Sequence, residues 1–132
     1  MSIVDIVYNE VARIRDKISD KIEQEESSKT LVKDTLYGFY QEYEYFRQRT
    51  NSPIDSEIDE MLKEYQTSFK NISVKLRDFL PKELLKKIQN LVFMIDNILT
   101  SIKSIETYLL DSVTVCADEA LDIYNNFDNY FI

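Results

Sequence analysis

The side chains that could do chemistry in this chain are few. Its 132 residues include no histidine and one cysteine, Cys116. The Ser–His–Asp and Cys–His arrangements of nucleophilic enzymes and the usual mixed zinc sites are therefore excluded. Cys116 lies on an apolar stripe, where a buried core thiol is expected instead of a nucleophile. A single glycine also leaves no glycine-rich loop for binding phosphate.

Two pairs of carboxylates remain as candidates for chemistry. Glu23 and Glu26, and likewise Glu57 and Glu60, have the Glu-x-x-Glu spacing that places two acids one helical turn apart. In this spacing they resemble the magnesium-binding pairs of all-helical nucleotide pyrophosphohydrolases of the MazG kind, and the resemblance implies a magnesium-dependent enzyme. Solvated helix faces and favourable acids near a helix N-terminus explain the same pairs. We expect no catalytic residue, no bound metal and no cofactor.

Composition predicts a few long helices. A chain of 132 residues suits one domain over residues 1–132, and one glycine with two prolines leaves little material for tight turns. One cysteine cannot form an internal disulfide, so a reducing cytoplasm is expected. The longest purely apolar run, residues 91–95, is far shorter than the ~20 residues that span a bilayer. These features predict a cytoplasmic protein without a membrane contact.

Apolar residues recur at spacings of three and four along nearly the whole chain, which is typical of amphipathic helices. Ser2 is the expected N-cap of a first helix, and residues 24–29, with Ser27 or Ser28 as the next cap, are expected to break it. Pro81 is expected to separate the third helix from the rest. The expected helices cover about residues 2–22, 28–50, 53–79 (with Ser52 as N-cap and Pro53 at the first position) and 82–130.

The segment "YGFYQEYEYF" (37–46) contains six aromatic rings in ten positions. As a helix it places Phe39, Tyr43 and Phe46 on one arc with Val32 and Leu36, and Tyr40 lies beside that arc. A strand would group the rings differently, and base stacking would need neighbouring positive charge, whereas the intervening charges are acidic. Tyr37 and Tyr45 point away from the arc and are candidates for contact with a partner.

The expected helix over residues 82–130 would be about 73 Å long at 1.5 Å per residue. A compact domain of this size has a radius of gyration near 14 Å, so an unbroken helix would project far from it. Either the helix breaks and folds back, or its projecting part is covered by another chain. Three consecutive β-branched residues and nearby capping side chains place the expected break near residues 111–114. The fold class predicted is all-α, an antiparallel bundle of four to five helices.

Charge is distributed unevenly around a net value of −8. Residues 104–132 contain six acidic residues and no Lys or Arg, whereas residues 70–87 contain six basic residues and two acidic ones. This balance repels phosphate backbones, so general nucleic-acid binding is not expected. The basic and acidic segments could bind each other within one chain or between two.

These features predict a non-catalytic protein–protein interaction module, an adaptor, assembly subunit or regulator that binds another protein or itself through apolar and aromatic helix faces and an acidic C-terminal segment. The alternative is a small acidic inhibitor or nucleic-acid mimic of the viral or mobile-element type, which would occupy a basic groove of its target. The candidate partner-binding residues are Tyr37, Tyr45, Asp118, Glu119, Asp122, Tyr124, Asp128, Tyr130 and Phe131.

Overall fold

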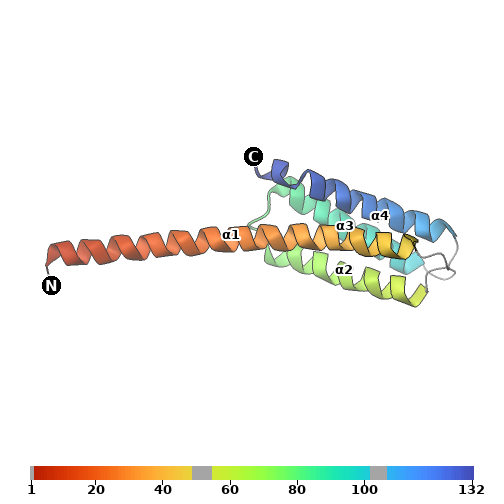
Figure 1. The fold of residues 1–132 in the computed structure, drawn as a ribbon, viewed down its shortest axis with the longest axis horizontal. Coiled ribbons are helices and arrows are strands. Elements are labelled where there is room, and N and C mark those ends of the chain that lie inside the picture. Colours follow the sequence, from red (N-terminus) through yellow and green to blue (C-terminus); the bar gives the residue numbers. More distant parts are fainter. Residues whose placement is uncertain (1, 49–54, 102–106) are drawn as a thin grey trace. The chain divides into compact units, whose positions relative to one another are not determined.

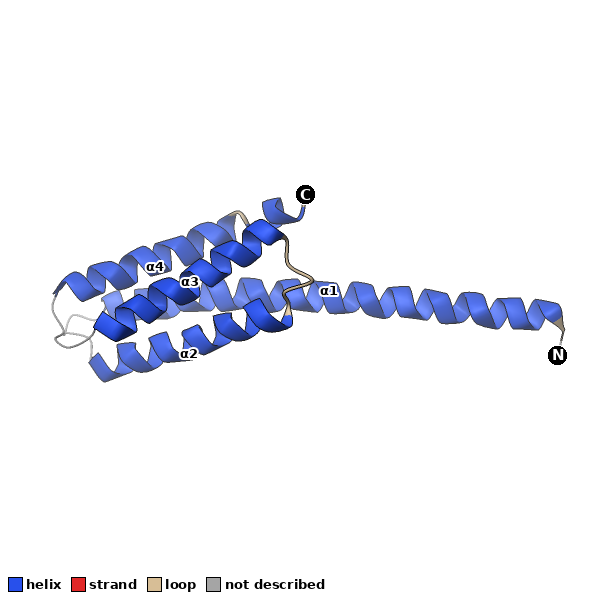
Figure 2. Ribbon diagram, turned by 180° about the vertical axis from the view of Figure 1, so that it is seen from behind, coloured by secondary structure: helices blue, strands red, loops and turns tan. Residues whose placement is uncertain are grey.

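The computed structural model describes residues 2–48, 55–101 and 107–132, and none of these residues lies in a β-strand (Figure 2). The described residues form four α-helices and one short 3-10 helix. In chain order these are α1 (Ile3–Gln48), α2 (Asp55–Lys75), α3 (Lys82–Ser101), α4 (Thr107–Asn125) and η1 (Phe127–Phe131) (Figure 1). The predicted all-α class is confirmed.

The chain divides by its internal contacts into two units, Met1–Leu31 and Val32–Ile132. The first unit is the N-terminal part of α1. The second contains the remainder of α1 with α2, α3, α4 and η1, whose helices run alternately in opposite directions as an antiparallel bundle (Figure 1). The single domain expected over residues 1–132 stays a prediction, since a division by contacts between residues does not show which parts fold independently.

The core of the second unit is built from the predicted apolar stripes. Each helix also buries residues beside its main stripe, such as Leu62 and Leu84, because a helix in a bundle faces two neighbours. Gly38 is placed where α1 and α2 approach closely, since a β-carbon there would lie 3.0 Å from the Tyr65 hydroxyl. The fully buried large side chains are Val32, Leu36, Phe39, Leu62, Phe69, Leu84, Ile88, Leu91, Ile95, Val113, Ile123 and Phe127.

The first helix begins as predicted but does not break where expected. The backbone N–H of Asp5 donates to Ser2 Oγ over 3.2 Å, which is the predicted N-cap. The expected break at residues 24–29 is wrong, because α1 continues through this segment to Gln48. Gln, Glu and Lys are good helix formers, and two serines cost only a few tenths of a kcal/mol each, about 1 kcal/mol in total. A pause in the apolar stripe is therefore no reason for the helix to end.

The break expected near residues 111–114 is also wrong, because these residues lie inside α4. The low helix propensity of Val113 and Thr114 is offset by their contacts. Val113 is buried, and the hydroxyls of Thr114 and Tyr43 share a hydrogen bond of 2.6 Å between α4 and α1. The chain instead leaves α3 after Ser101 and enters α4 at Thr107. The α-helices of the described chain number four, because the first two expected helices are one.

The helix boundary at Pro81 is confirmed. The α2 helix ends at Lys75, a turn follows in which the N–H of Leu80 donates to Leu76 O over 2.9 Å, and α3 begins at Lys82. Proline has no N–H to donate and disfavours helical geometry at the preceding residue, which explains the interruption. The expected Ser52 cap and Pro53 start of the preceding helix lie outside the described residues.

Candidate protein-interaction surfaces

The first candidate surface is a row of aliphatic side chains on the first unit, which we call the N-terminal stripe. It consists of Val4, Val7, Val11, Ile14 and Ile18, at the alternating three- and four-residue spacing that keeps them on one helix face. Apolar residues at this spacing are typical of helices that pack against other helices. In the structure their exposed fractions are 75, 55, 49, 50 and 55%. These five side chains thus form an exposed apolar row on the first unit.

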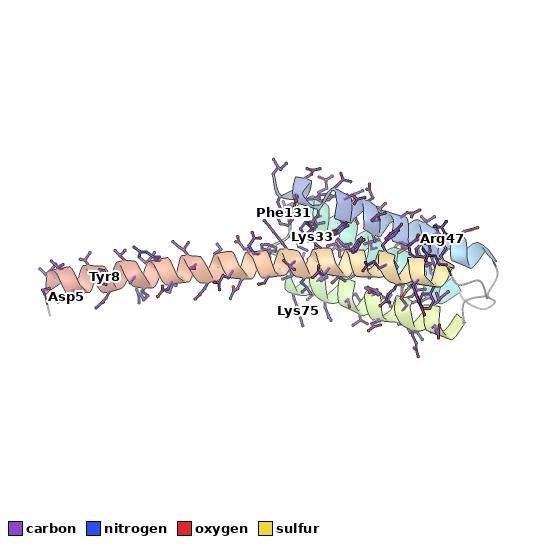
Figure 3. The ribbon with its side chains drawn as sticks, viewed as in Figure 1. Asp5, Tyr8, Lys33, Arg47, Lys75 and Phe131 are labelled. Atoms are coloured by element: carbon purple, nitrogen blue, oxygen red, sulfur yellow. The ribbon has the colours of Figure 1, made fainter. Side chains whose placement is uncertain are left out.

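Charged side chains flank the N-terminal stripe. The Arg13 guanidinium forms an ion pair with Glu10 one turn earlier in the helix. Arg15 and Lys17 lie further along, and both are exposed. Tyr8, which is 73% exposed, extends from the same segment into solvent, as does Asp5 (Figure 3). An apolar row bordered by charges is the pattern of a helix that packs against another helix.

The composition of the N-terminal stripe is the signal that sequence reasoning did not use. All five side chains are β-branched and similar in size, whereas the covered stripe of α1 contains Leu36, Phe39 and Tyr43. Aromatic side chains of unequal size need a cavity shaped by several neighbouring helices. A row of similar Val and Ile residues suits a narrow seam with one matching helix.

The second candidate surface joins α1 and α4 through two of the predicted residues. The rings of Tyr37 and Tyr124 stack with a centroid distance of 4.8 Å and an interplanar angle of 29°. Lys33, one helical turn before Tyr37 on α1 (Figure 3), places its Nζ 5.6 Å from the Tyr124 ring and 5.7 Å from that of Phe127. Tyr37 is 38% exposed, so this contact leaves part of its ring accessible. The cation–π contacts fix the position of Lys33 beside these rings.

Tyr45 does not join this cluster. Its ring packs edge-on against Phe46 at 5.7 Å, and its side chain is 60% exposed. The expectation that Tyr37 and Tyr45 point away from the buried arc agrees with their exposure. However, Tyr37 contacts another helix of the same unit, so only part of it remains available to a partner.

The aromatic C-terminal end mostly completes the core. Phe131 packs against Phe127 at 5.1 Å and Phe79 at 5.9 Å, and Tyr130 is partly buried against the same cluster. Burial raises the pKa of the Tyr130 hydroxyl. These two predicted partner-binding residues therefore have a packing role within the chain.

The acidic side chains predicted for partner contact are spread along α4 and η1. Asp118, Asp122 and Asp128 are exposed, and the Asp122 carboxylate accepts a 3.2 Å hydrogen bond from Asn126 Nδ2. Glu119 is partly buried and lies 3.6 Å from Lys87 Nζ on α3. This ion pair links the basic and acidic segments within one chain, and at such exposure it contributes at most ~1 kcal/mol.

The groups considered for catalysis are not assembled into a site among the described residues. Cys116 is fully buried, and burial raises the pKa of its thiol to about 12, which keeps it protonated near neutral pH. Glu23 and Glu26 belong to the first unit, whereas Glu57 and Glu60 belong to the second. Within the described part of the chain, no group of three or more His, Cys, Asp or Glu side chains is arranged to hold a metal ion.

Comparisons with protein-family models, with curated proteins and with solved structures find no match. No helix within residues 2–48, 55–101 and 107–132 has the length and apolar character needed to cross a bilayer. The candidate surfaces are thus defined by this chain's own geometry alone, and the N-terminal stripe is the larger exposed apolar feature of the two.

Proposed function

We propose that the protein is a non-catalytic helical interaction module that binds another protein, or itself, through the N-terminal stripe. The single observation that carries this proposal is that five β-branched side chains on one helix face are about half exposed or more. Contiguous exposed apolar surface bordered by polar residues is characteristic of protein-interaction sites. The second unit supplies a folded body with its own hydrophobic core.

The role of adaptor, assembly subunit or regulator belongs to the same proposal. Such proteins need a stable scaffold and a surface for a partner, and no reactive side chain. A reducing compartment such as the cytoplasm suits a chain whose one cysteine is buried and forms no disulfide. With a net charge of −8, general nucleic-acid binding is not part of the proposal.

A second candidate function is an acidic inhibitor that occupies a basic groove of a target. The exposed carboxylates of Asp118 and Asp122, one helical turn apart on α4, support it together with Asp128 on η1. Binding of that kind would weaken steeply as salt concentration rises, because screened charges would supply the affinity. Binding through the N-terminal stripe would be nearly insensitive to salt.

The experiment compares two variants that differ only in which face of the first unit they change. Val11→Glu places a charge in the N-terminal stripe, and Ile6→Glu places the same charge on another face at similar exposure, 49 against 53%. We expect the protein tagged at its C-terminus to retain its specific interactors in the native source with Ile6→Glu and to lose them with Val11→Glu. If both variants retain the same interactors, the stripe does not mediate binding.

A further inference from the structure

We propose that the occupant of the N-terminal stripe is the same stripe of another copy of this chain, in a parallel coiled coil over about residues 3–18. This inference rests on the proposed interaction function and names its partner. It follows from the register of the apolar residues, the sizes of their side chains and the positions of the charges beside them.

The stripe fits a heptad repeat without interruption. Val4, Val11 and Ile18 occupy position a, and Val7 and Ile14 occupy position d. In a parallel pairing each of these residues meets its own counterpart, which gives five consecutive layers of matched β-branched side chains. Identical partners in every layer have equal volumes, so the seam packs evenly without the large and small residues that an unlike partner would require.

The charges beside the seam are complementary to themselves. Glu10 occupies position g and Arg15 occupies position e of the following heptad. These are the two positions that meet across a parallel coiled coil, so Glu10 of each copy would contact Arg15 of the other. Because the pairing is reciprocal, two such contacts form in a two-stranded coil. Ile3 at position g and Tyr8 at position e would meet in the same way and extend the apolar seam.

The parallel orientation is favoured over the antiparallel one by the apolar layers. An antiparallel pairing centred on Val11 and Ile14 places Val4 opposite Lys21, which occupies position d. It keeps four apolar layers and sets a Lys against Val at each end. The parallel pairing keeps five uninterrupted apolar layers. Lys21 would meet Lys21 of the other copy only after the last of these layers, so the coil is expected to end before this residue.

The first test is the mass of the full chain in solution, measured by sedimentation equilibrium over a wide range of protein concentration. We expect the mass to approach two or three times the chain mass of 15.7 kDa, since β-branched residues at both a and d also accommodate a third strand. Val11→Glu should raise the dissociation constant by roughly 100-fold or more, because like charges would face each other inside the seam. Ile6→Glu, which carries the same charge on another face, should change it by less than about 3-fold.

A charge exchange tests whether the stripe meets a copy of itself. Arg15→Glu should weaken association by about 10-fold, since two ion pairs become two like-charge pairs. Adding Glu10→Lys should restore most of the lost affinity, because the two positions then carry opposite charges again, with their signs exchanged. Arg13→Glu breaks only the ion pair within the helix and should have a much smaller effect, since position c does not face the seam.

Orientation is read from disulfide formation. In a parallel coil Val4→Cys places two thiols in one a-layer, so mild oxidation should yield a covalent dimer. The unsubstituted chain, whose one thiol is buried at Cys116, should give none under the same conditions. Association without this crosslink would overturn the parallel arrangement.

The outcomes separate this inference from the proposed function. A chain that stays monomeric at all concentrations overturns self-association, and so does association that Val11→Glu leaves unchanged. If that monomer still loses a different protein with Val11→Glu, the interaction function stands and only the identity of its partner is wrong. Circular dichroism of each variant checks that the helices remain formed. We expect no loss of helix, because the substituted side chains are exposed in the single chain.

Discussion

Helix α1 contains two stretches that carry the same sequence signal and have opposite surroundings. Val11 and Phe39 occupy the same heptad position four heptads apart, yet the exposed fraction is 49% at Val11 and 0% at Phe39. Both stretches are amphipathic, and both are helical. The two stretches belong to different units. Phe39 lies in the second unit, where Tyr65 of α2 packs against its ring and Thr114 of α4 shares a hydrogen bond with Tyr43, whereas the N-terminal stripe lies in the first unit.

The comparison shows that periodicity determines which face of a helix is apolar but not which element buries it. Burial of a fully exposed Val or Ile contributes ~1.5–3 kcal/mol. The five side chains of the N-terminal stripe, which are 49–75% exposed, each forgo part of that stabilisation while they remain in water. An apolar stripe that is exposed within its own unit is therefore informative about partners.

Truncation at the two positions should have very different effects on stability. Phe39→Ala removes a ring that packs edge-on against Tyr65 at 5.1 Å and Phe69 at 6.0 Å, so we expect the free energy of unfolding to fall by about 3–5 kcal/mol. Val11→Ala removes exposed methyl groups and should change the monomer by less than about 0.5 kcal/mol. Urea denaturation followed by circular dichroism measures both. Equal losses at dilutions where the chain is monomeric would mean that Val11 is buried within its own chain.

The burial of Cys116 in the second unit should make the free energy of unfolding depend on pH in the alkaline range. The ordinary pKa of a cysteine thiol is 9.0, and burial raises that of Cys116 to about 12 in the folded chain. The folded state therefore holds this proton more tightly than the unfolded state. The contribution of the Cys116 thiol to the free energy of unfolding is fully present below pH 9. It is lost as pH rises toward 12, with a limiting slope of about 1.4 kcal/mol per pH unit.

Cys116→Ala provides the control for this prediction. The difference in unfolding free energy between the original chain and this variant should shrink as pH rises from 9 toward 12. Adding Val11→Cys to the variant should restore little pH dependence, because that thiol is partly exposed in the monomer. A difference that stays constant up to pH 12 would show that the thiol is accessible to water in the folded chain.

The smallest of the three effects concerns a hydrogen bond between helices. Tyr43→Phe removes the hydroxyl that shares a 2.6 Å hydrogen bond with Thr114, so we expect a loss of about 0.5–1.5 kcal/mol. Tyr8→Phe in the first unit removes a hydroxyl from a side chain that is 73% exposed and should change the stability of the monomer by almost nothing. Thermal unfolding of the two variants under identical conditions gives the comparison. A similar loss in both would contradict the different surroundings of the two stretches.

The burial pattern of the aromatic segment 37–46 could be predicted from its helical spacing, whereas its role in binding a partner stays a prediction. The rings of Phe39 and Tyr43 are buried as the helical arc predicts, and Tyr37 and Tyr45 are the more exposed rings of the segment. The stack of Tyr37 on Tyr124 could not be predicted, because it joins residues 87 positions apart whose proximity depends on how the helices are arranged. The packing of Phe131 on Phe79 could not be predicted for the same reason, and its contact with a partner stays a prediction.

The sequence by itself determined that the chain is helical, where Ser2 and Pro81 set helix boundaries, and which face of each helix is apolar. These properties depend on neighbours within one or two helical turns, which are present in the sequence as spacing and capping residues. The tertiary structure alone decided that Thr114 is held inside α4, and that Val32, Leu36, Phe39 and Tyr43 are buried while the N-terminal stripe is exposed. Burial depends on the arrangement of helices that are distant in sequence, and a local spacing pattern does not predict that arrangement.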